Sequence, residues 1–169
     1  FKGHKKNYNK EHKNFIETRD YDKIEKILTD VSVNRPDITV VVIDTLYYVI
    51  MSEYMDKAKT KGFDKFVDMG LHFWKLMNQI DTLRSDLTVV LMSHTSTEEF
   101  GERGFDVPGG KLVKEKVKPE GLATIVLETE VDYKDGNPNF RFLTQHAGDG
   151  LAKSPEGMFP DRHIPNDLS

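Results

Sequence analysis

Two short runs of apolar, mostly β-branched residues, at 38–43 and 87–92, constrain the fold of this chain more than any other feature. Neither run alternates between polar and apolar residues, which is typical of a strand buried on both faces. Each run is followed at once by polar side chains, Asp44 after the first and Ser93 and His94 after the second. We therefore expect two strands of a parallel sheet, with polar groups where the strands end.

The segments before and between these runs have the pattern of helices. In residues 18–33 and 64–83 the apolar side chains recur three and four positions apart, which places them on one helix face, and 45–58 is a further expected helix. A strand, a helical connection and a second strand form a βαβ unit, whose crossover is almost always right-handed. The sequence therefore predicts helices packed against a parallel sheet.

The second half of the chain has a different pattern. Residues 95–120 are polar and rich in glycine and lysine, which predicts a long loop. The turn sequence Asp-Gly-Asn-Pro at 135–138 lies between two expected strands, 122–131 and 140–144, and so predicts a hairpin. We expect the tail, 145–169, to be a loop.

Composition limits the function classes that remain. The length of 169 residues suits one domain, which we place at 18–169 after a basic lead-in at 1–17. There is no cysteine, which excludes disulfides, zinc–thiolate sites and cysteine nucleophiles. No apolar run approaches the roughly 18 residues of a membrane span. Because the net charge is -4, contact with DNA would need a local basic patch.

The polar residues at the strand ends are the candidate site. In open parallel sheets, ligands bind beyond the carboxyl ends of the strands. A carboxylate there, Asp44, could hold a Mg²⁺-bound water beside nucleotide phosphates, and Thr45 could add a hydroxyl. Two structural explanations stay open at this point. Asp44 precedes an expected helix and could cap it, and His94 could be an edge histidine with a satisfied hydrogen bond.

The phosphate-binding motif G-x-x-x-x-G-K-[ST] is absent from the chain. The Gly-Gly-Lys at 109–111 is followed by leucine and lies after the second strand, so it is no phosphate loop. Because the chain starts at Phe1, we expect it to be a fragment with any phosphate loop upstream. Other chemistries have less support: Glu128 and Glu130 are expected on an exposed strand face, and His72 has no ligand-type residue four positions on, as a zinc motif requires.

In this order and spacing, the segments resemble the RecA-like ATP-binding proteins of tailed bacteriophages, which act in DNA recombination and single-strand annealing. The resemblance is carried by Asp-Ile-Thr-Val-Val-Val-Ile-Asp-Thr at 37–45, Val-Val-Leu-Met-Ser-His at 89–94, Pro-Gly-Gly-Lys-Leu at 108–112, Ala-Lys-Ser-Pro-Glu-Gly-Met-Phe at 152–159 and Ile-Pro-Asn-Asp-Leu at 164–168. It implies an α/β fold, namely a RecA-like P-loop NTPase core whose largely parallel sheet is flanked by helices, with a C-terminal β-hairpin.

The resemblance also implies roles for single residues. Asp44 would be the Walker B carboxylate on Mg²⁺, and Thr45 and Ser93 would contact the bound ATP. His94 would be the sensor of the γ-phosphate. Lys153 would reach the nucleotide of a neighbouring subunit as a cationic finger, although Pro155 stands where the family has an arginine.

Residues 95–120 would correspond to the DNA-facing loops of the family, with a row of lysines that contacts phosphates without reading sequence. The cationic members of this segment are Lys111, Lys114, Lys116 and Lys118.

The resulting expectation is a Mg²⁺-dependent ATPase that acts on DNA in recombination or replication, in the cytoplasm of a bacterial host. Its implied partners are single-stranded DNA, further copies of the chain in a ring or filament, and a phage single-strand-binding protein, with no membrane. Two alternatives remain open. One is a non-catalytic DNA-binding or annealing module, and the other is a metal-dependent hydrolase or nuclease that uses Asp44.

Overall fold

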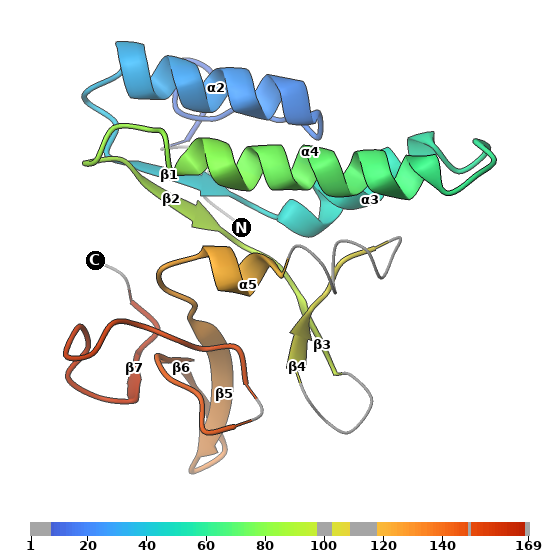
Figure 1. Cartoon of the computed structure of the whole chain (residues 1–169). Helices are drawn as coiled ribbons and strands as arrows, with labels where there is room; N and C mark the ends of the chain where they lie inside the picture. The colour runs from blue at the N-terminus through green and yellow to red at the C-terminus, as the bar shows by residue number, and fades with distance from the viewer. Residues whose placement is uncertain (1–7, 98–102, 109–117, 149, 168–169) are drawn as a thin grey trace.

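The computed structural model of the chain describes residues 8–97, 103–108, 118–148 and 150–167. Figure 1 shows a helical part, in which helices lie beside a pair of strands, and a C-terminal part built mainly from strands. The helices of the helical part are α2 (Tyr21–Asn34), α3 (Leu46–Asp56) and α4 (Asp64–Ile80). No helix within the described ranges is long and apolar enough to cross a membrane.

The two apolar runs form the strands of the helical part. β1 (Val40–Ile43) pairs in parallel with β2 (Thr88–Leu91), with Val40 opposite Thr88 and Ile43 opposite Leu91. The chain between these strands contains α3 and α4, which makes the connection a helical crossover of the kind that parallel strands need.

The core lies between the three helices and one face of this strand pair. Leu28, Leu46, Phe73 and Leu76 come from all three helices and are at most 1% exposed. α2 can start at Tyr21 because the side chain of Asp20 accepts a hydrogen bond from the Lys23 N–H at 3.1 Å. The helical part therefore has the amphipathic helices that the sequence predicts.

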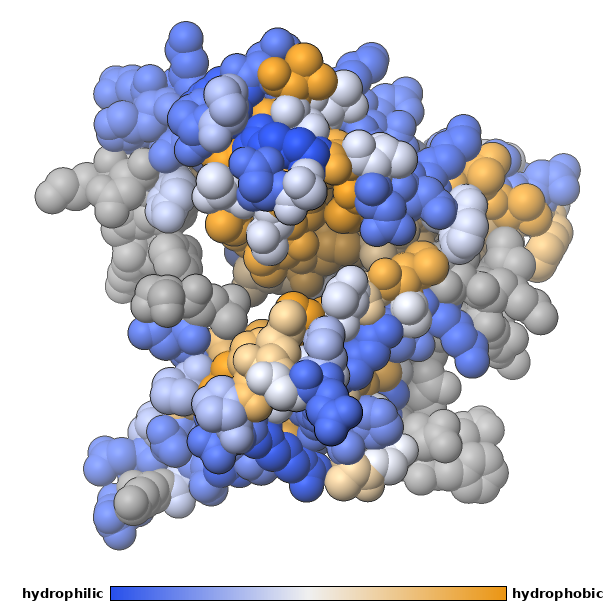
Figure 2. All heavy atoms as spheres, turned by 60° about the vertical axis from the view of Figure 1, so that its left-hand side comes forward, coloured by the Kyte–Doolittle hydropathy of each residue, from blue (hydrophilic) through white to orange (hydrophobic). Residues whose placement is uncertain are grey.

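The opposite face of the strand pair is open. Val41 and Ile43 of β1 pack against the core, whereas Val40 and Val42 are 53% and 55% exposed. Figure 2 shows hydrophobic side chains lining a hollow between the helical part and the C-terminal part. The strands of this pair are therefore covered on one face only.

The predicted fold class, a RecA-like P-loop NTPase core with a largely parallel sheet flanked by helices, is wrong. In the described ranges the strands form three small sheets, and only the two-stranded β1–β2 pair is parallel. The prediction relied on unbroken apolar runs as a sign of burial on both faces. Here β1 alternates in burial although its residues do not alternate in chemistry, because its core face alone packs against the helices.

The predicted loop at 95–120 is also wrong in part. β3 (Thr95–Thr97) pairs antiparallel with β4 (Arg103–Phe105), and α5 (Pro119–Leu122) begins immediately after Lys118. Each of these elements has only three or four residues, which is too short for a periodic pattern to reveal. Val107, just after β4, belongs to the buried core of the helical part.

The C-terminal part is an antiparallel sheet of three strands. β5 (Glu128–Lys134) and β6 (Asn137–Leu143) form the expected hairpin, although both strands are displaced from their predicted bounds. Asp135 and Gly136 make its two-residue turn, and both have positive φ (52° and 78°), the backbone that tight hairpins favour. β7 (His163–Pro165), in the predicted loop of the tail, adds to the edge of β6.

The predicted division into a lead-in at 1–17 and a domain at 18–169 stays a prediction. A hydrogen bond joins the lead-in to the helical part, donated by Arg35 Nη1 to the Lys13 carbonyl at 3.2 Å.

Candidate functional site

The register of β1 and β2 brings four of the predicted site residues to one edge. Past the last strand pair, the Met92 N–H donates to the Ile43 carbonyl at 3.0 Å, and the Leu46 N–H donates to the Met92 carbonyl at 2.9 Å. These two bonds hold the segment after β1 beside the segment after β2. As a result, Asp44 and Thr45 lie at the same carboxyl edge as Ser93 and His94.

The structural explanation for Asp44, that it caps the following helix, does not apply. The N-cap of α3 is Thr45, so Asp44 lies one position before the cap. Asp44 is exposed, and by strand alternation it shares the open face with Val42. Its carboxylate is therefore available at the end of the strand instead of being used to start the helix.

Two hydroxyl oxygens at this edge are buried and have no hydrogen-bond partner among the described residues. They are Thr45 Oγ1 and Ser93 Oγ, one from the end of each strand. Thr45 does not use its side chain to cap α3, although threonine at an N-cap usually does. Because buried polar atoms nearly always have partners, a pair of orphaned hydroxyls at one edge indicates a place where a polar group can bind.

Three aromatic rings surround the same edge. Tyr47 and Tyr48, in the first turn of α3, meet the ring of His94 from the segment after β2. The Tyr47 and His94 ring centroids are 5.3 Å apart at an interplanar angle of 81°, and those of Tyr48 and His94 are 6.3 Å apart at 89°. This contact with two tyrosine rings fixes His94 at the edge.

The donors at this edge fit Mg²⁺ only in part. One carboxylate and two hydroxyls are oxygen donors of the kind that Mg²⁺ prefers, and this ion commonly keeps several waters and takes further ligands from phosphates. Among the described residues, no group of three or more histidine, cysteine, aspartate or glutamate side chains could hold a metal ion. Asp44, Thr45 and Ser93 would therefore hold Mg²⁺ only together with water and the phosphates of a ligand.

Lys153 is not brought to this edge by any described contact. Its backbone forms an isolated β-bridge with Val126, and its Nζ donates a hydrogen bond to the Gly121 carbonyl at 3.3 Å. Both partners belong to the C-terminal part. No hydrogen bond or ion pair between described residues joins Lys153 to Asp44 or His94, so its predicted role in a neighbouring subunit stays a prediction.

The predicted DNA contacts lie mostly beyond what the structure describes. Lys111, Lys114 and Lys116 fall outside the described residues. Lys118 is exposed and has a left-handed backbone (φ 47°) directly before α5. Its ammonium group is available for a phosphate contact, but one lysine is not a basic patch.

Sequence reasoning misplaced one carboxylate. Glu128 was expected on an exposed face, yet its side chain is 4% exposed. It accepts hydrogen bonds from the backbone N–H groups of Leu151 and Ala152, at 3.0 and 3.3 Å, and from Arg103 Nη1 at 3.2 Å. Glu128 lies opposite Leu143 in the register of β5 and β6, a pairing that the sequence alone does not reveal.

A second polar cluster joins the helices. His72 was expected to lack a partner on its own helix, and its Nδ1 instead lies 2.7 Å from Glu53 Oε1 on α3. Lys57 Nζ lies 2.9 Å from the same oxygen. Tyr21 OH and Glu53 Oε2 are buried and have no hydrogen-bond partner among the described residues. The pKa of Tyr21 is raised far above its ordinary value, mainly by burial and to a smaller extent by the nearby charge of Glu53.

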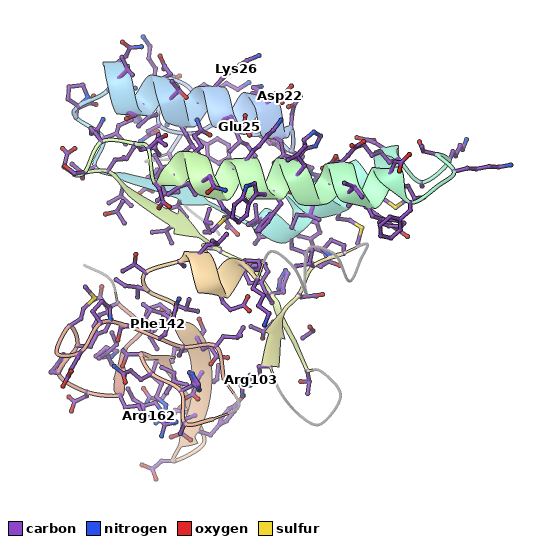
Figure 3. The ribbon with its side chains drawn as sticks, viewed as in Figure 1. Asp22, Glu25, Lys26, Arg103, Phe142 and Arg162 are labelled. Carbon is purple, nitrogen blue, oxygen red and sulfur yellow. The ribbon has the colours of Figure 1, made fainter. Side chains whose placement is uncertain are left out.

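A shallow groove with several acidic residues also lies on the helical part. Asp22, Glu25 and Lys26, labelled in Figure 3, line it along α2, and Gln79 of α4 forms part of its wall. Gln79 Nε2 donates to the Glu25 carbonyl at 2.7 Å, so this contact joins α4 to α2. None of the residues lining the groove belongs to the strand edge.

Comparison of the chain with protein-family models, with curated proteins and with solved structures found no match.

Proposed function

We propose that the carboxyl edge of β1 and β2 binds the Mg²⁺ complex of a nucleoside triphosphate, and that the chain takes part in ATP hydrolysis coupled to DNA. The observation that carries this proposal is the pair of orphaned buried hydroxyls, Thr45 Oγ1 and Ser93 Oγ, beside the exposed carboxylate of Asp44. Hydroxyls and a carboxylate at the ends of parallel strands suit a metal–phosphate ligand.

Each residue has a distinct part in the proposed reaction. Water attacks the terminal phosphorus, the bond to the bridging oxygen breaks, and the products are ADP and phosphate. Bound Mg²⁺ would neutralise charge on the phosphate oxygens. Asp44 would hold a water of the metal, the hydroxyls of Thr45 and Ser93 would contact phosphate or metal-bound water, and an N–H of His94 would donate to the terminal phosphate.

The Tyr47 and Tyr48 contacts give His94 a fixed position for this task. A ring held by two neighbours loses less conformational freedom when a ligand binds, which makes its hydrogen bond to phosphate more favourable. His94→Ala should therefore weaken turnover more than it weakens nucleotide binding. A retained binding constant with lost turnover would separate the histidine's proposed role from that of Asp44.

The first experiment measures nucleotide binding by the 169-residue chain, by calorimetry with ATP in the presence and absence of Mg²⁺. The matched variants are Asp44→Asn and Asp81→Asn, which remove the same charge at opposite ends of the strand pair, since Asp81 follows α4 and precedes β2. We expect Mg²⁺-dependent binding that is lost in Asp44→Asn and kept in Asp81→Asn. An affinity for ATP that does not depend on Mg²⁺, or that is equal in the two variants, would contradict the proposal.

A second candidate function is a nucleotide- or DNA-binding module without turnover. It is favoured by the absence of the motif G-x-x-x-x-G-K-[ST] from the sequence, because the backbone amides and lysine of that motif hold the phosphates during transfer. Release of phosphate from ATP by the wild-type chain, measured with and without single-stranded DNA, separates the two candidates. Mg²⁺-dependent binding without phosphate release would favour the module.

Self-association and the finger role of Lys153 form a separate part of the proposal. In a mixture of the two variants, some interfaces would join the intact Lys153 of an Asp44→Ala subunit to the intact Asp44 of a Lys153→Ala subunit. Partial recovery of turnover in the mixture, compared with either variant alone, would support action in trans. A mixture as inactive as its components would oppose it.

A further inference from the structure

The aromatic rings at the carboxyl edge of β1 and β2 are not part of the hydrophobic core. Tyr47 and Tyr48 are neither members of the core cluster nor among the partly buried apolar residues that pack against it. Tyr48 is 53% exposed, and His94 is exposed as well. Burial of apolar surface therefore does not explain why three rings gather at this point of the molecule.

The rings are arranged as a corner. Tyr47 and Tyr48 have their centroids 5.3 Å apart at 86°, and each meets His94 at a similarly steep angle. Edge-to-face contacts of this kind are favourable for aromatic pairs, so the rings support one another without help from the core. The exposed part of Tyr48 is left available to a ligand.

The position of this corner relative to the orphaned hydroxyls is fixed by the backbone. The Tyr48 N–H donates a hydrogen bond to the Thr45 carbonyl at 3.2 Å, so one turn of chain carries both groups. His94 likewise follows Ser93 directly. An oxygen-rich edge that suits phosphate and metal thus adjoins a flat aromatic surface.

We infer that Tyr48 forms a nucleobase-binding site and stacks on the base of a ligand whose phosphate lies at Asp44, Thr45 and Ser93, while Tyr47 and His94 support the Tyr48 ring through their edge-to-face contacts. This inference rests on the proposed function and adds the recognition of the base to it. A ligand that combines a planar heteroaromatic ring with phosphate matches both surfaces. Two sources carry this chemistry, a free nucleotide and a nucleic-acid strand, and binding assays distinguish them.

The experiment compares ATP, tripolyphosphate, AMP and oligodeoxythymidylate as ligands of the 169-residue chain with Mg²⁺ present. Tripolyphosphate offers the phosphates without a base. Because a base stacked on an aromatic side chain contributes substantially to binding, ATP should bind about tenfold more tightly than tripolyphosphate. Tyr48→Ala should remove that difference, and because Tyr47 still contacts His94, the affinity for tripolyphosphate should fall much less than the affinity for ATP.

Two variants control for structure. Tyr48→Trp keeps a stacking surface and should retain the preference for ATP. Tyr133→Ala removes another exposed tyrosine, 71% exposed on β5 of the C-terminal part, and should change nothing. Chemical shifts of the Tyr48 ring on addition of each ligand give a readout that does not depend on turnover, and the melting temperature shows that each variant is folded.

The outcomes separate the inference from the function on which it rests. If ATP and tripolyphosphate bind equally and Tyr48→Ala changes neither, the base site is refuted while the phosphate site stands. Another outcome is that oligodeoxythymidylate binds but neither ATP nor tripolyphosphate does. If Tyr48→Ala then lowers the affinity for oligodeoxythymidylate at least fivefold, the base site takes a nucleic-acid strand and the proposed nucleotide site is refuted. If ATP binds without shifting the Tyr48 ring, the base site alone is refuted, and if none of the ligands binds, both are refuted.

Discussion

The helical part and the C-terminal part are stabilised by different kinds of contact. The helical part encloses a cluster of fully apolar side chains, among them Leu28, Leu46 and Phe73, from three helices. In the C-terminal part the buried residues include Glu128 and Thr144, whose polar atoms bond to backbone groups of distant segments. The candidate site is therefore built on the apolar core, whereas the strands of the C-terminal part depend on polar contacts.

The largest effect should come from the apolar core. Phe73 is completely buried, so Phe73→Ala should lower the free energy of unfolding by about 3–5 kcal/mol. Trp74, the next residue on α4, is 44% exposed, and Trp74→Ala should cost far less. Urea unfolding of both variants checks the prediction. Equal losses would mean that α4 does not bury the face that the structure shows.

The buried carboxylate should come next. Glu128→Ala leaves the N–H groups of Leu151 and Ala152 and the guanidinium of Arg103 without this acceptor. The loss of a buried acceptor costs about 1–3 kcal/mol, and the amides of residues 151 and 152 should exchange hydrogen faster.

A matched control for this change lies on the same strand. Glu130 shares the strand face of Glu128 but is 25% exposed, and it pairs with Arg141 and His163. Glu130→Ala should have the smaller effect, because its partners can be hydrated. If it destabilises the chain more than Glu128→Ala does, polar burial is not what holds the C-terminal part together.

The smallest effect should come from the polar cluster on the helices. Burial opposes the charge of Lys57, but hydrogen bonds to Glu53 and Asp68 outweigh it and raise the pKa of the ammonium group. A raised pKa contributes stability that is complete below the unfolded-state value of about 10.4 and is lost as pH rises through the folded-state value. Glu53→Gln should therefore cost up to about 1 kcal/mol at neutral pH, since Lys57 is partly exposed.

The pH dependence of this cost is the sharper measurement. We expect the difference in unfolding free energy between wild type and Glu53→Gln to shrink as pH rises through the folded-state pKa of Lys57. Asp56→Asn, which changes an exposed neighbour, serves as the control. A difference that grows in this range would contradict the assigned role of Lys57.

The positions of the main helices and of β1 and β2 could be predicted, because helix spacing and β-branched runs are strong local signals. The extent of the sheet could not. Val40, Val41 and Val42 are chemically identical, so the sequence does not tell which of them faces helices and which faces the open side. That ambiguity led to the RecA-like fold, and it is resolved only by where the helices lie.

The sequence predicted the residues of the candidate site that follow the strands, but it did not predict the aromatic residues beside them. Asp44 and His94 could be placed together because parallel strands end at one edge. Tyr47 and Tyr48 looked like ordinary residues of an apolar helix, since their exposure depends on how α3 packs. Glu128 was missed for the opposite reason, because its partners at 151 and 152 are far away in sequence.

The proposed function requires that a metal-bound nucleotide lies at the carboxyl edge of β1 and β2. The most direct measurement replaces Mg²⁺ with paramagnetic Mn²⁺ in the presence of ATP and records which backbone amide signals broaden. We expect broadening at Asp44, Thr45, Ser93 and His94, with the signals of β5 and β6 unaffected. Broadening confined to the acidic groove on α2, or none that requires ATP, would contradict it.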